Sequence, residues 1–221
     1  MQNIQPNSQN KLFEYIYEKD HSNNGLENFF KSIITKFSNS FLFVDEFGNS
    51  YKYKNIFDTL EIKTKNLIKR KLIFCLCDNN TDSLMGYFLF LAERAIPMMI
   101  KLDTSKDQLN NLLEKYSPAY IWVNKERKFE HNNFREIDSF GDYILLATGY
   151  REYKINPSLG LLIGTSGSTG NTKFVRLSYK NIISNAFSIG EYLKINSREN
   201  VITTLKPSYT FALSILHSHL I

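Results

Sequence analysis

The residues with the clearest chemical potential lie in one short run, Gly164 to Lys173. Three glycines spaced three residues apart allow the backbone to approach a ligand closely: Gly164, Gly167 and Gly170. Four side chains add hydroxyl donors to the main-chain N–H groups: Thr165, Ser166, Ser168 and Thr169. Lys173 follows with a positive charge. Clustered N–H and O–H donors beside a cation suit a polyphosphate, so the run predicts a phosphate-binding loop.

The surroundings of this loop favour an anion. No Asp or Glu occurs from Tyr153 through Gly190, where the acidic fraction of the chain would give about four. The same window contains four basic residues: Lys154, Lys173, Arg176 and Lys180. Removing carboxylates and keeping cations raises the local electrostatic potential.

The run matches neither of two common phosphate-binding signatures, and a flexible linker explains it less well. The common Gly-x-x-x-x-Gly-Lys phosphate signature needs a glycine where Thr169 or Thr172 stands, and Gly-x-Gly-x-x-Gly fails because no two glycines are two apart. A flexible Ser/Gly linker would lack buried flanking strands. Here Leu161–Ile163 and Phe174–Val175 anchor both ends, which favours a loop between two strands.

The elements that would position this loop alternate between strands and helices. Apolar runs predict strands at 72–77, 97–100, 119–123 and 159–163, and a return strand at 173–177. Polar caps at Asn79–Asp82, Asp103–Ser105 and Ser178 predict helices to about 95, to about 116 and through Leu193. This order predicts an α/β fold, a parallel sheet with helices on both faces.

Other segments carry weaker patterns. The N-terminal part predicts a helix over 26–37, a hairpin of strands 41–44 and 51–53, and a helix spanning Ile56 to Ile68. A polar stretch, 124–142, is interpreted as a separation, which gives an N-terminal α/β subdomain over 1–155 and the start of a second one over 156–221. Val201–Leu205 predicts a further strand, and the apolar stretch that follows predicts a helix running to Ile221.

Composition excludes several classes of protein. The net charge of +5 comes from 27 basic and 22 acidic residues scattered along the chain, unlike a nucleic-acid-binding surface. The only two cysteines, Cys75 and Cys77, provide no disulfide framework, and we expect them to point to opposite faces of a strand. No apolar run approaches the roughly 20 residues of a membrane span, and the start is polar, so a cytoplasmic protein is expected. The four histidines are scattered or terminal; packing or surface roles are expected for them, and no metal site is predicted.

The loop resembles a known signature. Thr165-Ser166-Gly167-Ser168-Thr169-Gly170-Asn171-Thr172-Lys173 is similar to the T-S-G-S-T-G-x-P-K motif of the AMP-binding, adenylate-forming superfamily, which contains acyl-CoA synthetases, luciferases and peptide-synthetase adenylation domains. Leu177–Asn181 resembles the L-T-H-x-N segment of that family, and Asp45, Gly48 and Tyr51 resemble its D-x-x-G-x-x-x-T-Y segment. The resemblance covers most of this chain but only about the first half of an adenylating domain.

The resemblance implies a function. It implies an acid–thiol ligase in which a small-molecule carboxylic acid reacts with Mg²⁺-ATP, releases pyrophosphate and passes from an acyl-adenylate to coenzyme A or phosphopantetheine. Thr165 to Gly170 and Lys173 would hold the β- and γ-phosphates, and the aromatic segment with Tyr209 and Phe211 would line the substrate pocket.

Three positions depart from the family pattern: Thr172, Phe174 and Ala212. The later family motifs, including the catalytic lysine, would lie beyond Ile221, so no catalytic residue is assigned and this fragment is expected to be inactive by itself. A separately encoded C-terminal half or a carrier protein would then be a partner. The alternative is a non-catalytic remnant or nucleotide- or pyrophosphate-binding module.

Overall fold

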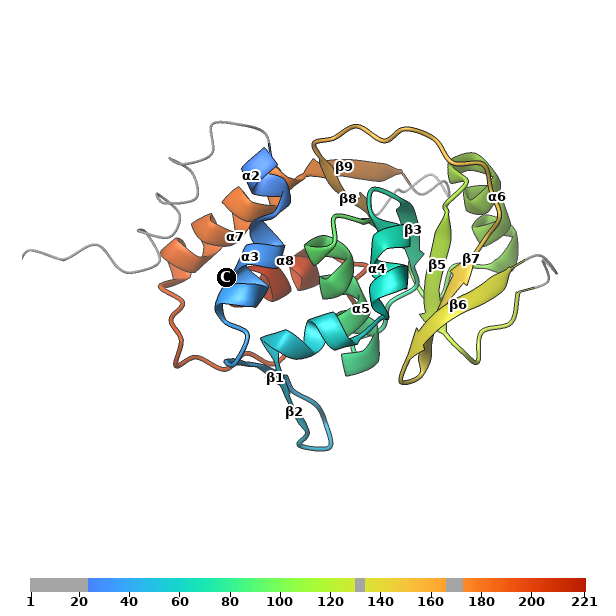
Figure 1. Ribbon diagram of the computed structural model, residues 1–221. Coiled ribbons are helices and arrows are strands. Elements are labelled where there is room, and N and C mark those ends of the chain that lie inside the picture. Colours follow the sequence, from blue (N-terminus) through green and yellow to red (C-terminus); the bar gives the residue numbers. More distant parts are fainter. Residues whose placement is uncertain (1–23, 130–133, 166–172) are drawn as a thin grey trace, which may run out of the picture.

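The structure is a computed structural model that describes residues 24–129, 134–165 and 173–221. Its centre is a seven-stranded sheet in the order β6-β7-β5-β3-β4-β8-β9 (Figure 1). The inner strands β5 (Tyr120–Asn124), β3 (Leu72–Cys75), β4 (Ile96–Met99) and β8 (Leu159–Gly164) are mutually parallel. The outer strands β6 (Arg135–Phe140), β7 (Tyr143–Ala147) and β9 (Phe174–Ser178) pair antiparallel. The α/β fold with a largely parallel sheet is confirmed.

Helices cover both faces of the sheet. On one face, α3 (Phe29–Lys36), α5 (Thr81–Ala92), α7 (Tyr179–Leu193) and α8 (Thr210–Leu220) share one hydrophobic core. On the other face, α6 (Lys106–Tyr116) packs through Leu109 and Leu113 against a second core. Side chains along β3 alternate between the two cores, with Ile73 and Cys75 in the first and Leu72 and Phe74 in the second. The sheet is therefore buried on both sides, as its continuous apolar runs predict.

Three predicted helix caps are confirmed. The side chain of Asn80 accepts a hydrogen bond from the Ser83 amide at 2.9 Å and starts α5. Ser105 does the same for α6 with the Gln108 amide, and Ser178 for α7 with the Asn181 amide. Each cap satisfies an N–H group that has no partner within the helix.

The predicted hairpin near the N-terminus is present as β1 (Phe41–Val44) and β2 (Ser50–Lys52). The carboxylate of Asp45 accepts hydrogen bonds from the backbone amides of Phe47 and Asn49 and orders the turn. Gly48 follows with φ +84°, a left-handed conformation that glycine adopts without strain. Asp45 and Gly48 therefore have a local structural role in this turn.

Several expectations were wrong. The polar stretch 124–142 contains β6, which extends the main sheet together with β7, so it is not a separation. The helix expected from Ile56 to Ile68 is divided into a 3₁₀ helix, η1 (Tyr53–Asp58), and α4 (Ile62–Ile68). The N-terminal helix is likewise divided into α2 (Asn24–Glu27) and α3. Val201–Leu205 forms no strand, and Ile202 is 83% exposed.

Cys75 and Cys77 also differ from expectation. Both side chains are buried in the same core, because residues two apart along an extended segment share a face. Burial raises the pKa of the Cys75 thiol well above its ordinary value, so this thiol stays protonated. The two residues act as small core side chains.

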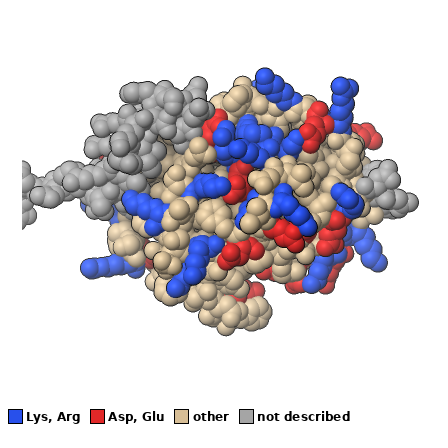
Figure 2. Space-filling model, in the orientation of Figure 1, with Lys and Arg blue, Asp and Glu red and all other residues tan. Residues whose placement is uncertain are grey.

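The main sheet contains strands from both predicted subdomains. β8, which begins the predicted second subdomain, pairs directly with β4. The boundary near residue 155 stays a prediction. Lys and Arg side chains are interspersed with Asp and Glu on the face seen in Figure 2. No helix among the described residues is both long and apolar enough to cross a bilayer.

Candidate functional site

The predicted phosphate-binding loop begins and ends at two described residues, Thr165 and Lys173. The carbonyl of Lys173 accepts a hydrogen bond from the Thr165 amide at 2.9 Å and another from the Thr165 hydroxyl at 3.2 Å. These bonds continue the antiparallel ladder of β8 and β9 past its last pair, Gly164 and Phe174. The five other predicted contacts lie outside the described residues: Ser166, Gly167, Ser168, Thr169 and Gly170.

Together these two hydrogen bonds form what we name the Thr165–Lys173 clasp. The clasp changes the expected role of the Thr165 side chain. Thr165 was expected to donate its hydroxyl proton to a phosphate, but that proton is directed at the Lys173 carbonyl. A hydroxyl has one donor and two acceptor positions, so its donor is occupied here. In this structure Thr165 holds the two ends of the predicted loop together.

The topology of the sheet favours a ligand at the same edge. β3 is followed by α5 on one face and its neighbour β4 by α6 on the other. Connections that leave adjacent parallel strands toward opposite faces create a crevice at the carboxyl ends, where open α/β sheets bind ligands. β8 lies on the other side of β4 and ends at Gly164, so Thr165 lies at this edge as well.

A second segment of the chain reaches the carboxyl edge. Asn79, just after β3, donates from its side-chain amide to the Thr203 carbonyl at 2.5 Å. Lys101, two residues after β4, places its ammonium group 5.7 Å from the ring centre of Tyr209. The segment 201–209 therefore lies across the ends of β3 and β4.

Tyr209 and Phe211, the predicted pocket residues, are placed differently. Tyr209 is the N-cap of α8 and is half exposed beside Lys101. Phe211 is 66% exposed. The structure thus brings Tyr209 to the edge where the predicted loop begins, and the pocket role of both residues stays a prediction.

Sequence reasoning missed Asn79 and Lys101 as members of this edge. Lys101 directly follows the predicted strand 97–100, and Asn79 lies two residues after the predicted strand 72–77. The carboxyl-end rule for parallel sheets would have singled them out.

The histidines do not form a site among the described residues. His217 is buried, and its Nε2 lies 2.7 Å from the hydroxyl of Tyr87. Burial lowers the pKa of His217 to about 3, which keeps its ring neutral. No group of three or more His, Cys, Asp or Glu side chains with metal-binding geometry occurs in the described ranges.

Comparisons with known proteins extend this geometry. No family model matches the sequence, and no curated protein matches it either. Solved structures do match. o-Succinylbenzoate coenzyme A synthetase from Bacillus subtilis, in complex with AMP, superimposes with a TM-score of 0.67 at 15% identity over 88% of this chain and 53% of its own. The luciferase-like enzyme from the mealworm Zophobas morio gives 0.63 at 13% identity over 88% and 52%.

A third match, MatB from Rhodopseudomonas palustris, has a TM-score of 0.67 at 12% identity over 88% of this chain and 43% of its own. Of these three neighbours, the first was solved with AMP bound. This chain has their fold. It spans about half the length of the solved structures it matches.

Proposed function

We propose that this chain forms the ATP-phosphate-binding part of a carboxylate-activating, AMP-forming ligase. The observation that carries the proposal is the Thr165–Lys173 clasp, which closes a glycine- and hydroxyl-rich segment at the carboxyl edge of the sheet. Support comes from the shared fold, since the synthetase from Bacillus subtilis has also been solved with ATP and magnesium.

In the proposed reaction, this segment would bind the phosphates that leave as pyrophosphate. The carboxylate oxygen of the substrate attacks the α-phosphorus of ATP, and the bond from that phosphorus to the bridging oxygen of the β-phosphate breaks. Pyrophosphate leaves with the bonding electrons, and an acyl-adenylate remains. Donors fixed around the departing phosphates stabilise the charge that develops there. Lys173 adds a positive charge at the end of the segment.

The residues present fit the phosphates better than a protein-bound metal. Magnesium typically keeps several waters and is held by substrate phosphates with only one or two carboxylates. The described residues offer no carboxylate cluster, whereas the predicted loop has hydroxyl and amide donors. Magnesium bound with ATP would neutralise phosphate charge.

The rest of the cycle is proposed from the same fold. The acyl group would pass from the adenylate to the thiol of coenzyme A or of a phosphopantetheine carried by a protein. Tyr209 and Phe211 would contribute to the pocket for a small carboxylic acid. A carrier protein and a C-terminal half supplied separately are the partners that this proposal implies.

A second candidate function is a nucleotide- or pyrophosphate-binding module without turnover. It rests on the same predicted phosphate loop, because hydroxyl and amide donors that bind phosphate do not by themselves provide turnover. ATP-[³²P]pyrophosphate exchange on the complete gene product, with a panel of carboxylic acids, separates the candidates. Acid-dependent exchange supports the ligase. ATP binding without exchange supports the module, and absence of binding of both ATP and pyrophosphate contradicts both candidates.

A further inference from the structure

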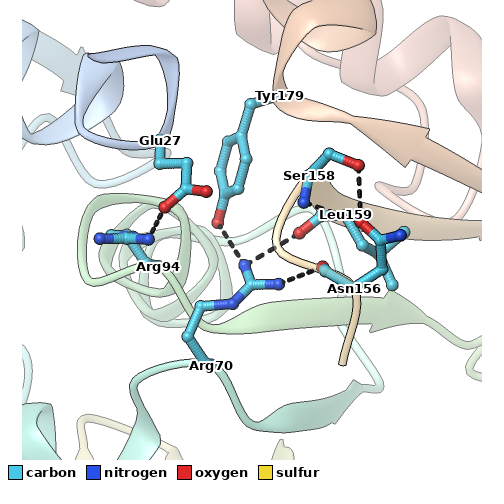
Figure 3. A network of polar contacts seen from close by, with 7 residues as sticks. All are labelled: Glu27, Arg70, Arg94, Asn156, Ser158, Leu159 and Tyr179. Carbon is cyan, nitrogen blue, oxygen red and sulfur yellow. Dashed lines mark hydrogen bonds and ion pairs between the residues drawn. The ribbon is translucent and has the colours of Figure 1, made fainter. Parts of the chain in front are cut away.

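Arg70 lies at the amino edge of the sheet, opposite the candidate site. It lies two residues before β3 and has φ 58°, a left-handed conformation that is uncommon for a residue with a side chain. Its guanidinium donates to the carbonyl of Asn156 at 2.6 Å and to the carbonyl of Leu159 at 3.0 Å (Figure 3). A residue in the first third of the chain thus holds the start of β8.

The same guanidinium also reaches the end of β9. One of its nitrogens lies 3.5 Å from the hydroxyl of Tyr179, the first residue of α7. Tyr179 directly follows Ser178, the β9 residue that pairs with Leu159. Arg70 therefore contacts the start of β8 and the residue just after β9, at one end of this strand pair. The Thr165–Lys173 clasp lies at the other end.

The residues that Arg70 contacts are themselves held in place by local contacts. The side chain of Asn156 accepts hydrogen bonds from the Ser158 amide at 2.9 Å and the Ser158 hydroxyl at 2.8 Å. The ring of Tyr179 is buried, which places its hydroxyl in a fixed position. A planar guanidinium presents several donors in fixed directions, and a lysine ammonium at this place has no such fork.

We propose that Arg70 is a positioning residue for the phosphate site. Its hydrogen bonds to the start of β8 and to Tyr179, just after β9, fix the position and direction of the Thr165–Lys173 clasp at the other end of the two strands. β8 contains six residues, so the clasp lies about 20 Å from the contacts of Arg70 at the usual rise of a strand. At that distance Arg70 acts through the strands and not by direct contact with phosphate. This inference rests on the proposed function of the clasp.

The chain contains a matched control for this role. Arg94 lies two residues before β4, also at the amino edge, and also has a left-handed φ of 60°. Its guanidinium forms an ion pair with Glu27 of α2, and not with the ends of β8 and β9 that Arg70 contacts (Figure 3). Both arginines are partly buried. Replacing Arg94 removes a charge and its ion pair with Glu27 while leaving the contacts of Arg70 in place.

The test compares Arg70→Met, Arg70→Lys and Arg94→Met with the unaltered chain. One readout is amide hydrogen exchange at Thr165 and along β8–β9, normalised to exchange in β3–β4. The other is the affinity for inorganic pyrophosphate, measured by calorimetry. We expect Arg70→Met to raise the normalised exchange at Thr165 at least fivefold and to weaken pyrophosphate binding about tenfold. Arg70→Lys should give intermediate values, and Arg94→Met should alter global stability without either specific effect.

Each outcome decides a separate point. Equal effects of Arg70→Met and Arg94→Met on both readouts would reduce Arg70 to a general stabilising residue and overturn the inference. Unchanged exchange at Thr165 in Arg70→Met would overturn it as well. No binding of pyrophosphate by the unaltered chain contradicts the proposed function, and the exchange data then still decide whether Arg70 holds the β8–β9 pair.

Discussion

The carbonyl of Lys173 accepts two hydrogen bonds from Thr165, one from the backbone amide at 2.9 Å and one from the side-chain hydroxyl at 3.2 Å. The hydrogen bond from the Thr165 backbone amide alone would continue the hydrogen-bond ladder between the strands. The hydroxyl adds a second restraint at the place where the strands end and the glycine-rich segment begins. The two ends of the predicted phosphate loop are thus joined by two hydrogen bonds. Under the proposed function, this restraint would lower the entropy cost of binding phosphate.

The hydroxyl of Thr165 should therefore matter to binding. Thr165→Val keeps the shape of the side chain and removes the hydrogen bond to Lys173, a loss of about 0.5–1.5 kcal/mol. If the full loss appears in binding, ATP affinity falls about twofold to tenfold. Thr165→Ser keeps the hydroxyl and should bind nearly as the unaltered chain does. Calorimetric titration with ATP checks both variants, and equal affinity for Val and Ser would show that the hydroxyl has no such role.

Gly86 should be intolerant of a side chain. An alanine Cβ at this position in α5 would lie 2.4 Å from the indole ring of Trp122, which is fully buried and donates to the Ser83 carbonyl. Overpacking of this kind typically lowers the free energy of unfolding by about 1–3 kcal/mol. Urea denaturation of Gly86→Ala should show this loss.

Gly190, in α7, provides the matched control, because nothing lies within 4 Å of an added Cβ there. Gly190→Ala should raise the free energy of unfolding by up to about 1 kcal/mol, since alanine favours helix more than glycine does. Equal destabilisation by the two alanine variants would contradict the packing described for Trp122.

The buried His217 should make stability depend on pH. Its pKa in the folded state is lowered to about 3, below the ordinary value of 6.5. The unfolded chain therefore binds a proton that the folded chain does not, and stability is fully present above pH 6.5 and lost as pH falls from 6.5 toward 3. The slope from this one group reaches at most about 1.4 kcal/mol per pH unit.

Replacement by a neutral side chain isolates this contribution. His217→Gln cannot titrate, and its amide can either donate a hydrogen bond to Tyr87 or accept one from it. Denaturation between pH 4 and 7 should give a shallower loss of stability for the variant than for the unaltered chain. The same pH dependence in both chains would rule out a neutral, buried His217.

The sequence was sufficient for the inner parallel strands and for β9 at one edge of the main sheet, but not for β6 at the other edge. β3, β4 and β8 are buried on both faces, so their residues form continuous apolar runs that need no knowledge of neighbours. β6 lies at the edge of the sheet and contains Arg135, Glu136 and Asp138 on a partly exposed strand, so its composition resembles a loop.

Strand propensity also gave one wrong answer, at Val201–Leu205. Valine, isoleucine and threonine favour extended backbone, but a strand requires a second strand to pair with, and this segment pairs with none of the strands in the described residues. The types of residue in the predicted phosphate loop could be identified locally. The contacts of Arg70 could not, because its partners are backbone carbonyls 86 and 89 residues further along the chain.

The central claim is that the segment between Thr165 and Lys173 binds the phosphates of ATP, and the affinity of three chains for ATP tests it most directly. Calorimetric titrations would compare the unaltered chain, Lys173→Met at the clasp and Lys180→Met on α7, an exposed lysine in the same window without carboxylates. We predict that Lys173→Met weakens ATP binding about tenfold, that Lys180→Met changes it less than twofold, and that tripolyphosphate competes with ATP. Equal affinity in all three chains, or no competition by tripolyphosphate, would contradict the claim.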